Sequence, residues 1–175
     1  MPQNSGKIFE GDFSNSIPEN YFKYKLKDSP GAWGQTENSK VRFTSSNICD
    51  FVIHNGKWLF LLELKSHKGA SLPITPKVNE KGKITHYGAI KANQLEGLMK
   101  EYYKWNVEAG FLINLSEKFK TYFVEVINVK NAIDEGKKSL GLEWLERNGT
   151  LIPQSTKKRG THQIYDLSML MKEVV

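Results

Sequence analysis

The pattern of apolar and polar residues changes period several times along the chain, which predicts a mixture of helices and strands. Apolar side chains recur at mostly helical spacing over residues 6–17, and we expect a helix there that Pro18 ends. Aromatic residues and lysines alternate over residues 21–26, as in a strand with one solvated face. Residues 28–47 are polar and contain a proline and two glycines, so we expect a long loop, and such loops in small domains are often functional.

Two apolar runs, residues 48–53 and 58–64, are joined through Asn55-Gly56, the kind of dipeptide that most strongly favours a tight hairpin turn. If that dipeptide forms the turn, Asp50 pairs with Leu61 on the opposite strand. Both faces of this hairpin are apolar. We therefore expect a central pair of strands that is covered on both sides.

The rest of the chain alternates between loops, helices and short strands. In chain order the pattern predicts a loop, an amphipathic helix, two short strands, a short helix, a basic loop and a closing helix, over residues 66–88, 89–105, 110–115, 121–127, 140–146, 157–159 and from about 166. This order favours a mixed α/β fold. Parallel pairing is expected only where the long helix crosses over between strands.

Composition narrows the class of protein. The 175 residues are 39% hydrophobic and 25% charged, which suits one globular domain over residues 1–175. No run approaches the roughly 18 consecutive apolar residues of a membrane span, and the first residues lack the apolar core of a signal peptide. Cys49 is the only cysteine, so it can form neither an internal disulfide nor, by itself, a thiolate metal site. We therefore expect a soluble intracellular domain that is not attached to a membrane.

The chain is basic. Its 25 Lys and Arg exceed its 19 Asp and Glu, for a net charge of +6. This balance suits a polyanionic partner, although a merely soluble basic surface explains it equally well. Only three of the basic residues are arginine. Because lysine reads base edges poorly, a nucleic-acid partner would be recognised by its backbone and shape and not by its sequence.

The predicted hairpin also carries the candidate chemistry. Strand alternation places Glu63 and Lys65 on the same face as Asp50, with Glu63 as its diagonal neighbour roughly 7–8 Å away. Two carboxylates at this spacing can converge on one hard divalent cation. The alternative is a plain ion pair between Glu63 and Lys65 at a strand end. A carboxylate among leucines is, however, costly to bury without a partner.

Asp50, followed by Glu63-Leu64-Lys65 at the end of the next strand, resembles the signature of the PD-(D/E)xK nuclease superfamily. More specifically, the chain resembles the RecU family of Holliday junction resolvases. The matching segments, in family order, also include residues 6–10, 93–95, 110–114 and 122–123. The resemblance implies a restriction-endonuclease-like mixed β-sheet flanked by helices. It also implies that residues 28–47 form a projecting stalk between the first two strands.

The resemblance implies a metal site. Asp50, Glu63 and the main-chain carbonyl of Leu64 would hold Mg²⁺, for which Mn²⁺ can substitute. The residue types agree, because oxygen ligands are present while paired thiolate or histidine ligands are absent from the motif. Lys65 would orient the attacking water or neutralise charge that develops on the phosphate.

Two further residues take catalytic roles by resemblance. Glu10 would help to hold the metal or its waters, and the alternative is an exposed glutamate favoured at the start of a helix. Gln94 would contact the active-site lysine or a phosphate, and the alternative is an ordinary polar helix face.

The substrate implied by the resemblance is a four-way DNA junction, cut by paired symmetric nicks in the cytoplasm of a bacterial cell or a phage-infected host. The candidate DNA-binding residues are Lys7, Trp33, Lys40, Arg42, Phe43 and Lys91. For residues 28–47 a disordered surface loop is the alternative, and their low arginine content departs from the family.

The family works as a homodimer, and Trp58, Tyr103 and Trp105 are candidates for the interface. No recombinase partner can be named. Two other functions remain open: a different PD-(D/E)xK nuclease that acts on duplex DNA, and a catalytically silent DNA-binding module that assists recombination.

Overall fold

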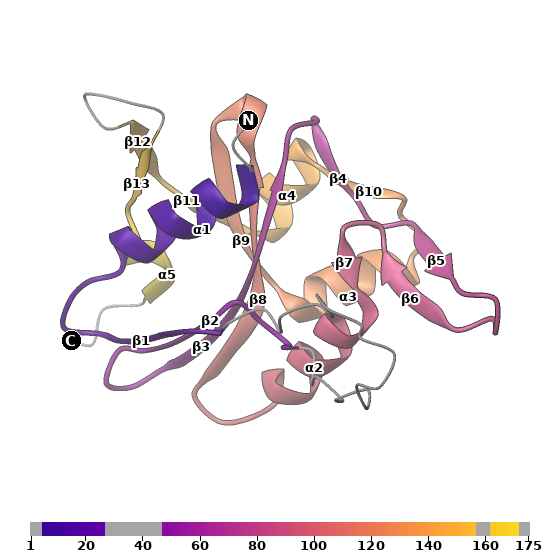
Figure 1. The fold of residues 1–175 in the computed structure, drawn as a ribbon, viewed down its shortest axis with the longest axis horizontal. Coiled ribbons are helices and arrows are strands. Elements are labelled where there is room, and N and C mark those ends of the chain that lie inside the picture. The colour runs from indigo at the N-terminus through magenta and orange to yellow at the C-terminus, as the bar shows by residue number, and fades with distance from the viewer. Residues whose placement is uncertain (1–4, 27–46, 157–161, 172–175) are drawn as a thin grey trace, which may run out of the picture.

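The computed structural model describes residues 5–26, 47–156 and 162–171 (Figure 1). The helices are α1 (Ser5–Ser16), α2 (Ala92–Tyr102), α3 (Val126–Asp134), α4 (Leu142–Asn148) and α5 (Ser168–Met171), with a short 3-10 turn, η1 (Ser116–Lys118). None of these helices is long and apolar enough to cross a bilayer. The N-terminal, long and C-terminal helices agree with the predictions. α3 was not predicted, and its first two residues fall in the strand expected over residues 121–127.

A six-stranded mixed sheet forms the centre of the molecule. Its order is β1-β2-β3-β8-β9-β11, and the strands are β1 (Phe22–Lys25), β2 (Phe51–His54), β3 (Leu59–His67), β8 (Val107–Leu115), β9 (Lys120–Glu125) and β11 (Thr150–Ile152). Only the β3–β8 pair is parallel, and α2 lies in the connection between those strands. Parallel neighbours need such a crossover, so the expected place of parallel pairing is confirmed.

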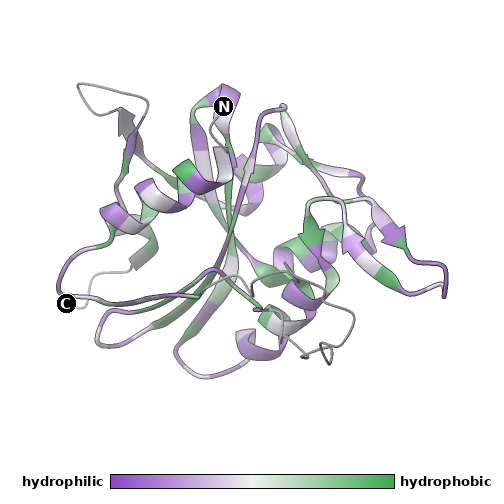
Figure 2. Ribbon diagram, viewed as in Figure 1, coloured by the Kyte–Doolittle hydropathy of each residue, from purple (hydrophilic) through white to green (hydrophobic). Residues whose placement is uncertain are grey.

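Helices cover both faces of this sheet (Figure 1). Under α1, the aromatic rings of Phe9 and Phe13 pack with Phe51 and Tyr165 in one core. The second core lies on the other face, where α2, α3 and α4 pack on the sheet. Figure 2 shows the hydrophobic positions concentrated along the central strands and on the helix faces that meet them. The predicted mixed β-sheet flanked by helices is therefore confirmed.

The β2–β3 hairpin forms with a register different from the one predicted. His54 pairs with Leu59 and Val52 with Leu61, so the two-residue turn is Gly56-Lys57 and not Asn55-Gly56. The side chain of Asn55 explains the shift, because its Oδ1 accepts the backbone N–H groups of Lys57 and Trp58 and closes the turn one residue later. Gly56 supplies the positive φ of 96°.

The register shift does not change which side chains share a face. The predicted pairs moved by an even number of residues, and side chains alternate with period two. The apolar residues of each strand therefore divide between the two cores as expected, with Phe60 and Leu62 under α1 and Leu61 on the α2 face.

Residues 66–88, predicted as a loop, contain short strands instead. Besides the end of β3 they form β4 (Ser71–Pro73), β5 (Pro76–Val78) and β6 (Ile84–Tyr87), and β7 (Ile90–Lys91) follows directly. β5, β6 and β7 make a three-stranded antiparallel sheet, and β4 pairs with β10 (Ser139–Gly141). The prediction failed because these strands are too short for an alternating pattern to stand out between prolines and glycines.

The C-terminal part packs against α1. β12 (Gln154–Thr156) pairs with β13 (Gln163–Tyr165), and the buried carboxylate of Asp12 accepts a hydrogen bond from the backbone of Gln163 and contacts the ring of His162 at 2.7 Å. The predicted basic loop, residues 157–159, lies outside the described residues.

Candidate active site

Asp50 lies where the β2–β3 ladder stops, just before Phe51. Its backbone N–H donates to the carbonyl of Leu62, and its Oδ2 accepts the backbone N–H of Leu64 at 2.7 Å. The predicted pairing of Asp50 with Leu61 is therefore wrong. The Asp50 carboxylate instead accepts a hydrogen bond from the backbone of Leu64, which is three residues beyond Leu61 and next to Glu63.

Glu63 is the buried centre of the cluster. Its side chain is only 3% exposed although it ends in a carboxyl group, and it lies between Leu62 and Leu64 on β3. Glu63 Oε1 accepts hydrogen bonds from Lys65 Nζ at 2.8 Å and from Gln94 Nε2 at 2.6 Å. Its second oxygen, Oε2, is buried without a hydrogen-bond partner among the described residues.

Gln94 joins α2 to this strand. It is the third residue of the helix, and its Oε1 accepts from Lys65 Nζ at 3.1 Å and from the backbone N–H of Lys91 at 3.3 Å. Gln94 is 5% exposed, so it is not part of an ordinary solvated helix face. The predicted contact between Gln94 and Lys65 is present.

The electrostatics of the cluster reflect burial. Burial, and to a smaller extent the charge of Asp50, raise the pKa of Glu63 from 4.5 to about 7, although Lys65 and the hydrogen bonds act in the opposite direction. Burial and the same two carboxylates raise the pKa of Cys49 to about 12. Cys49 is thus a small buried residue and lies close to both acids.

The cluster suits a hard divalent cation. Among the described residues there is no group of three or more His, Cys, Asp or Glu side chains that could hold a metal ion. Mg²⁺ is nevertheless commonly held by one or two carboxylates together with waters and substrate phosphates. Asp50, Glu63 and the carbonyl of Leu64 provide such a donor set, and the orphaned Glu63 Oε2 is a buried oxygen that a cation would satisfy.

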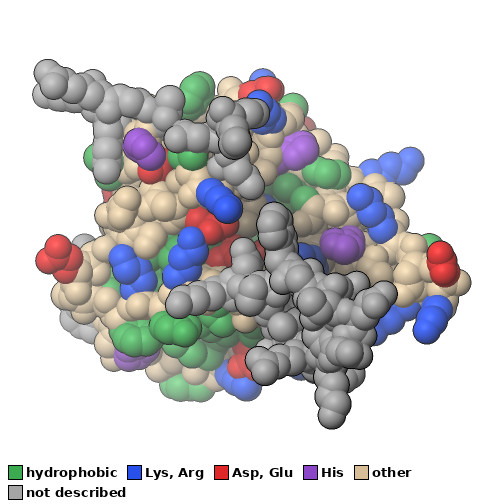
Figure 3. Space-filling view, viewed as in Figure 1, with side chains coloured by type: hydrophobic (Ala, Val, Ile, Leu, Met, Phe, Trp, Pro, Cys, Tyr) green, Lys and Arg blue, Asp and Glu red, His purple; other side chains and the backbone are tan. Residues whose placement is uncertain are grey.

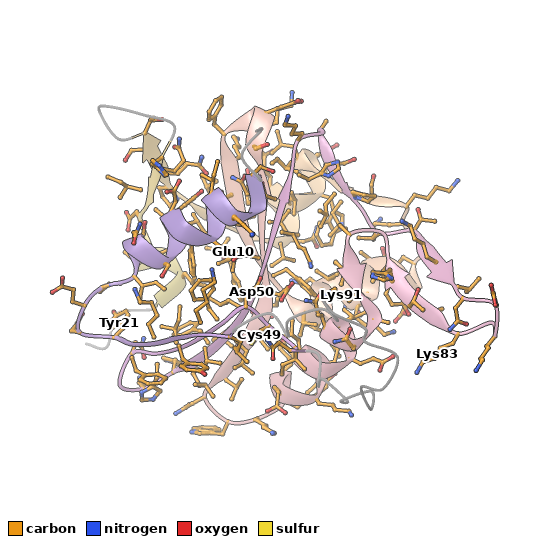
Figure 4. All side chains as sticks on the ribbon, in the orientation of Figure 1. Glu10, Tyr21, Cys49, Asp50, Lys83 and Lys91 are labelled. Carbon is orange, nitrogen blue, oxygen red and sulfur yellow. The ribbon has the colours of Figure 1, made fainter. Side chains whose placement is uncertain are left out.

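Glu10 does not contact this cluster directly. It projects from α1 and forms an ion pair of 2.7 Å with Lys25. Lys25 in turn pairs with Phe51, next to Asp50, and its Nζ lies 5.7 Å from the centre of the Phe51 ring. Figure 4 shows Glu10 on α1 and Asp50 below it in the central part of the view. Sequence reasoning did not single out Lys25, although the alternating lysines of residues 21–26 contained the signal.

The candidate DNA-binding residues are less closely connected to the acidic cluster. Lys7 and Lys91 are exposed, and Lys91 lies on β7 immediately before α2. The candidates of the predicted stalk, Trp33, Lys40, Arg42 and Phe43, lie outside the described residues. The segment that contains them does fall between β1 and β2, where the stalk was expected.

Of the histidines near the hairpin and the loop that follows it, His54 is exposed, whereas His67 and His86 are half-buried.

A mixed sheet with helices on both faces and this acidic cluster on its central strands is a restriction-endonuclease-like fold. The structure is similar to that of Hjc from Archaeoglobus fulgidus, a Holliday junction resolvase from an archaeal hyperthermophile, with a TM-score of 0.51. The two chains are 16% identical, and the similarity covers 83% of this chain and 95% of that one. No family model and no curated protein matches the sequence. At this identity the similarity concerns the fold alone.

Proposed function

We propose that this chain is a Mg²⁺-dependent, structure-selective DNA endonuclease that resolves four-way junctions by paired symmetric nicks, as RecU-type resolvases do. The observation that carries the proposal is Glu63 Oε2, a buried carboxylate oxygen close to Asp50 that has no hydrogen-bond partner among the described residues. Such an oxygen is costly to bury unless a cation binds it. The fold shared with an archaeal Holliday junction resolvase supports a nuclease and suggests the junction as substrate.

Asp50, Glu63 and the carbonyl of Leu64 are the groups that would hold the ion, and Mn²⁺ can replace Mg²⁺ because it accepts the same oxygen donors. When bound, the ion would polarise a phosphate oxygen and lower the pKa of a water molecule.

Lys65 and Gln94 would act on the substrate side of the cluster. The Lys65 ammonium group is held by Glu63 and Gln94, and the side chain as a whole is 14% exposed, so a substrate at the surface could approach it. There it can donate to a phosphate oxygen on which negative charge develops, or orient the attacking water. Gln94 fixes the position of this ammonium group and would be a positioning residue.

Two features of the proposal rest on the resemblance to the RecU family. Paired incisions across a four-way junction need two sites related by a two-fold axis, so we propose a homodimer. Tyr103 and Trp105 are 74% and 90% exposed and suit an interface, whereas Trp58 is half-buried against the core under α1. The stalk, residues 28–47, would enter the open centre of the junction.

The experiment that tests the function is a gel assay on a synthetic four-way junction and on a linear duplex with the same arm sequences. We expect symmetric paired nicks in the junction with Mg²⁺ or Mn²⁺ and no cutting in EDTA. Preferential cutting of the linear duplex would indicate a different nuclease of the superfamily. Binding without cutting of either substrate would indicate a silent recombination accessory module.

A further inference from the structure

The β5–β6–β7 sheet extends from the body of the molecule beside α2 (Figure 1) and is unusually basic. Residues 66–91 contain five lysines and a single glutamate, Glu80. None of these lysines forms an ion pair with a carboxylate of the described residues, whereas Lys104, Lys130 and Lys137 each do. Figure 3 shows basic side chains spread over this part of the surface with few acidic ones among them.

The strand register aligns three of its nitrogen-bearing side chains. Lys77 pairs with His86, and His86 pairs with Lys91, so the three side chains lie in one row on one face of the sheet. Lys77 and Lys91 are both exposed. Two strand spacings separate them, about 10 Å, which corresponds to roughly three nucleotides along one strand of B-DNA.

This row begins at the candidate active site. The backbone N–H of Lys91 donates to Gln94, whose amide contacts both Lys65 and Glu63. In Figure 4, Lys91 lies between Asp50 and the hairpin whose far end carries Lys83. A line of basic groups therefore runs outward from the acidic cluster to the end of the hairpin.

The sheet is held firmly in this position. At the tip, Asn79 Oδ1 accepts the backbone N–H groups of Lys81 and Lys83, both at 3.0 Å. At the base, Ile74 and Ile90 are fully buried in the core on the α2 face. Gly88 has a φ of 56° and packs against the backbone of Pro73. A Cβ at this position would lie 2.0 Å from the carbonyl oxygen of Pro73.

An ordered hairpin with an unbalanced charge is not explained by folding. The lysines of the hairpin repel one another, and none of them forms an ion pair with a described carboxylate. Local rules of this kind are broken mainly where a surface serves a function. The single exposed large apolar side chain of the hairpin, Val78, is too small a patch for a protein interface.

We propose that the β5–β6–β7 sheet is a DNA-backbone-binding arm, which holds the phosphates of the duplex segment that leads away from the cleavage site. This inference rests on the proposed nuclease function and adds the path of the substrate to it. The lysines of the arm act as point charges on phosphates, so the arm contributes affinity and orientation without base specificity.

The first test compares two variants with the same change in net charge. Lys77, Lys81 and Lys83 are replaced by Gln in one, and Lys104, Lys130 and Lys137 in the other, each combined with Asp50→Asn to prevent cutting. Binding of a labelled linear duplex is measured over a salt series by fluorescence anisotropy. We expect the arm variant to bind about tenfold or more weakly, with a salt slope smaller by about 2–3, and the control variant to change little.

The second test maps the position of the arm on DNA. Cys49 is the only cysteine and is buried, with a pKa raised to about 12, so a cysteine introduced by Lys83→Cys can be labelled selectively with an iron chelate. The conjugate should cut the duplex backbone at a fixed distance on one side of the protein's own incision. A Lys130→Cys conjugate, on α3, should give no such cut.

The possible results distinguish a failure of the proposed DNA-binding arm from a failure of the proposed nuclease function. Equal losses in both triple variants, or no loss in either, would overturn the arm and leave the nuclease untouched. Scattered or absent cuts from the Lys83→Cys conjugate of a cleaving protein would do the same. An unsubstituted protein that neither binds nor cuts DNA would instead overturn the proposed function, and the arm with it.

Discussion

Gln94 Nε2 donates to Glu63 Oε1 at 2.6 Å, and this contact determines the orientation of the whole amide group. With its nitrogen on Glu63, the amide oxygen faces Lys65 Nζ, from which it accepts at 3.1 Å. The reverse orientation would place the NH₂ group against the ammonium group and the oxygen against the carboxylate, and both pairs would repel. One glutamine on α2 thus bridges Glu63 and Lys65 of β3, which also contact each other directly at 2.8 Å.

Removal of either carboxylate should abolish cleavage. Asp50→Asn and Glu63→Gln keep the shape of the side chains but remove the charge that a divalent cation needs. Junction binding should remain largely intact, because phosphate contacts elsewhere dominate affinity. Lys65→Ala should reduce turnover by roughly 10²–10³-fold if the ammonium group stabilises transition-state charge. Strand cutting by both carboxylate variants at millimolar Mg²⁺ would refute the site.

Replacement of Gln94 should weaken the site through its neighbours. Gln94→Glu places a further carboxylate against Glu63, and we expect a 10–100-fold loss, with a higher Mg²⁺ concentration needed for half-maximal cleavage. Glu96→Gln, an exposed change on the same helix, is the control. A uniform loss of activity with an unchanged Mg²⁺ requirement would mean that Gln94 only supports the fold.

Stability without metal should depend on pH through Glu63. Because the folded-state pKa of about 7 exceeds the ordinary 4.5, the folded protein holds this proton more tightly than the unfolded chain does. The stabilisation from Glu63 is therefore complete below pH 4.5 and lost as the pH rises to about 7, by on the order of 3 kcal/mol. Urea unfolding in EDTA from pH 4.5 to 8 measures this slope. Glu63→Gln should lack this component of the slope, and an identical slope in both proteins would contradict the assignment.

The protein should be a dimer in solution. Light scattering at micromolar concentration should give about 40 kDa, twice the chain mass of 20.0 kDa. Tyr103→Ser with Trp105→Ser should shift the mass towards the monomer, because these side chains are the most exposed aromatic residues of the described chain. Phe119→Ser, at another exposed aromatic residue, serves as the control. A monomer that still makes paired incisions would exclude this assembly.

Shortening of the predicted stalk should affect junctions more than duplexes. Residues 33–43 are replaced by a Gly-Ser bridge, with Asp50 and Glu63 unchanged, and affinities are compared at one ionic strength. A junction offers partly unstacked bases, on which Trp33 or Phe43 can stack for about 1–3 kcal/mol each, whereas a duplex offers mainly phosphates. Equal losses of affinity for both substrates would indicate that this segment is only a basic loop without selectivity for junctions.

The sequence predicted which residues form the acidic cluster although the hairpin turn was misplaced, because an even shift of register leaves each side chain on the same face. The turn was placed one residue too early, yet Glu63 and Lys65 remained on the α2 face, since the resulting shift of register was even. What alternation could not give was the detail at Asp50, whose carboxylate binds the backbone of Leu64 where the ladder ends. Side-chain contacts at a ladder end depend on tertiary geometry that no local pattern contains.

The basic arm was missed for a different reason. Its strands are two to four residues long and are separated by proline and glycine, so composition favoured a loop. The arm is held in place by contacts between residues distant in sequence, such as the burial of Ile74 and Ile90 in the core on the α2 face. The contact of Gln94 with Lys65, by contrast, was expected only from the family resemblance, because the two residues are 29 positions apart.

The two cores on either side of β3 also fix the register of the strand that carries the candidate active site. A slip of one residue in the pairing of β3 would turn every side chain to the opposite face. Glu63 and Lys65 would then enter the aromatic core under α1, while Phe60 and Leu62 would leave it. Chains with misplaced acids are thereby excluded from the folded population by hydrophobic packing alone, before any metal or substrate is present.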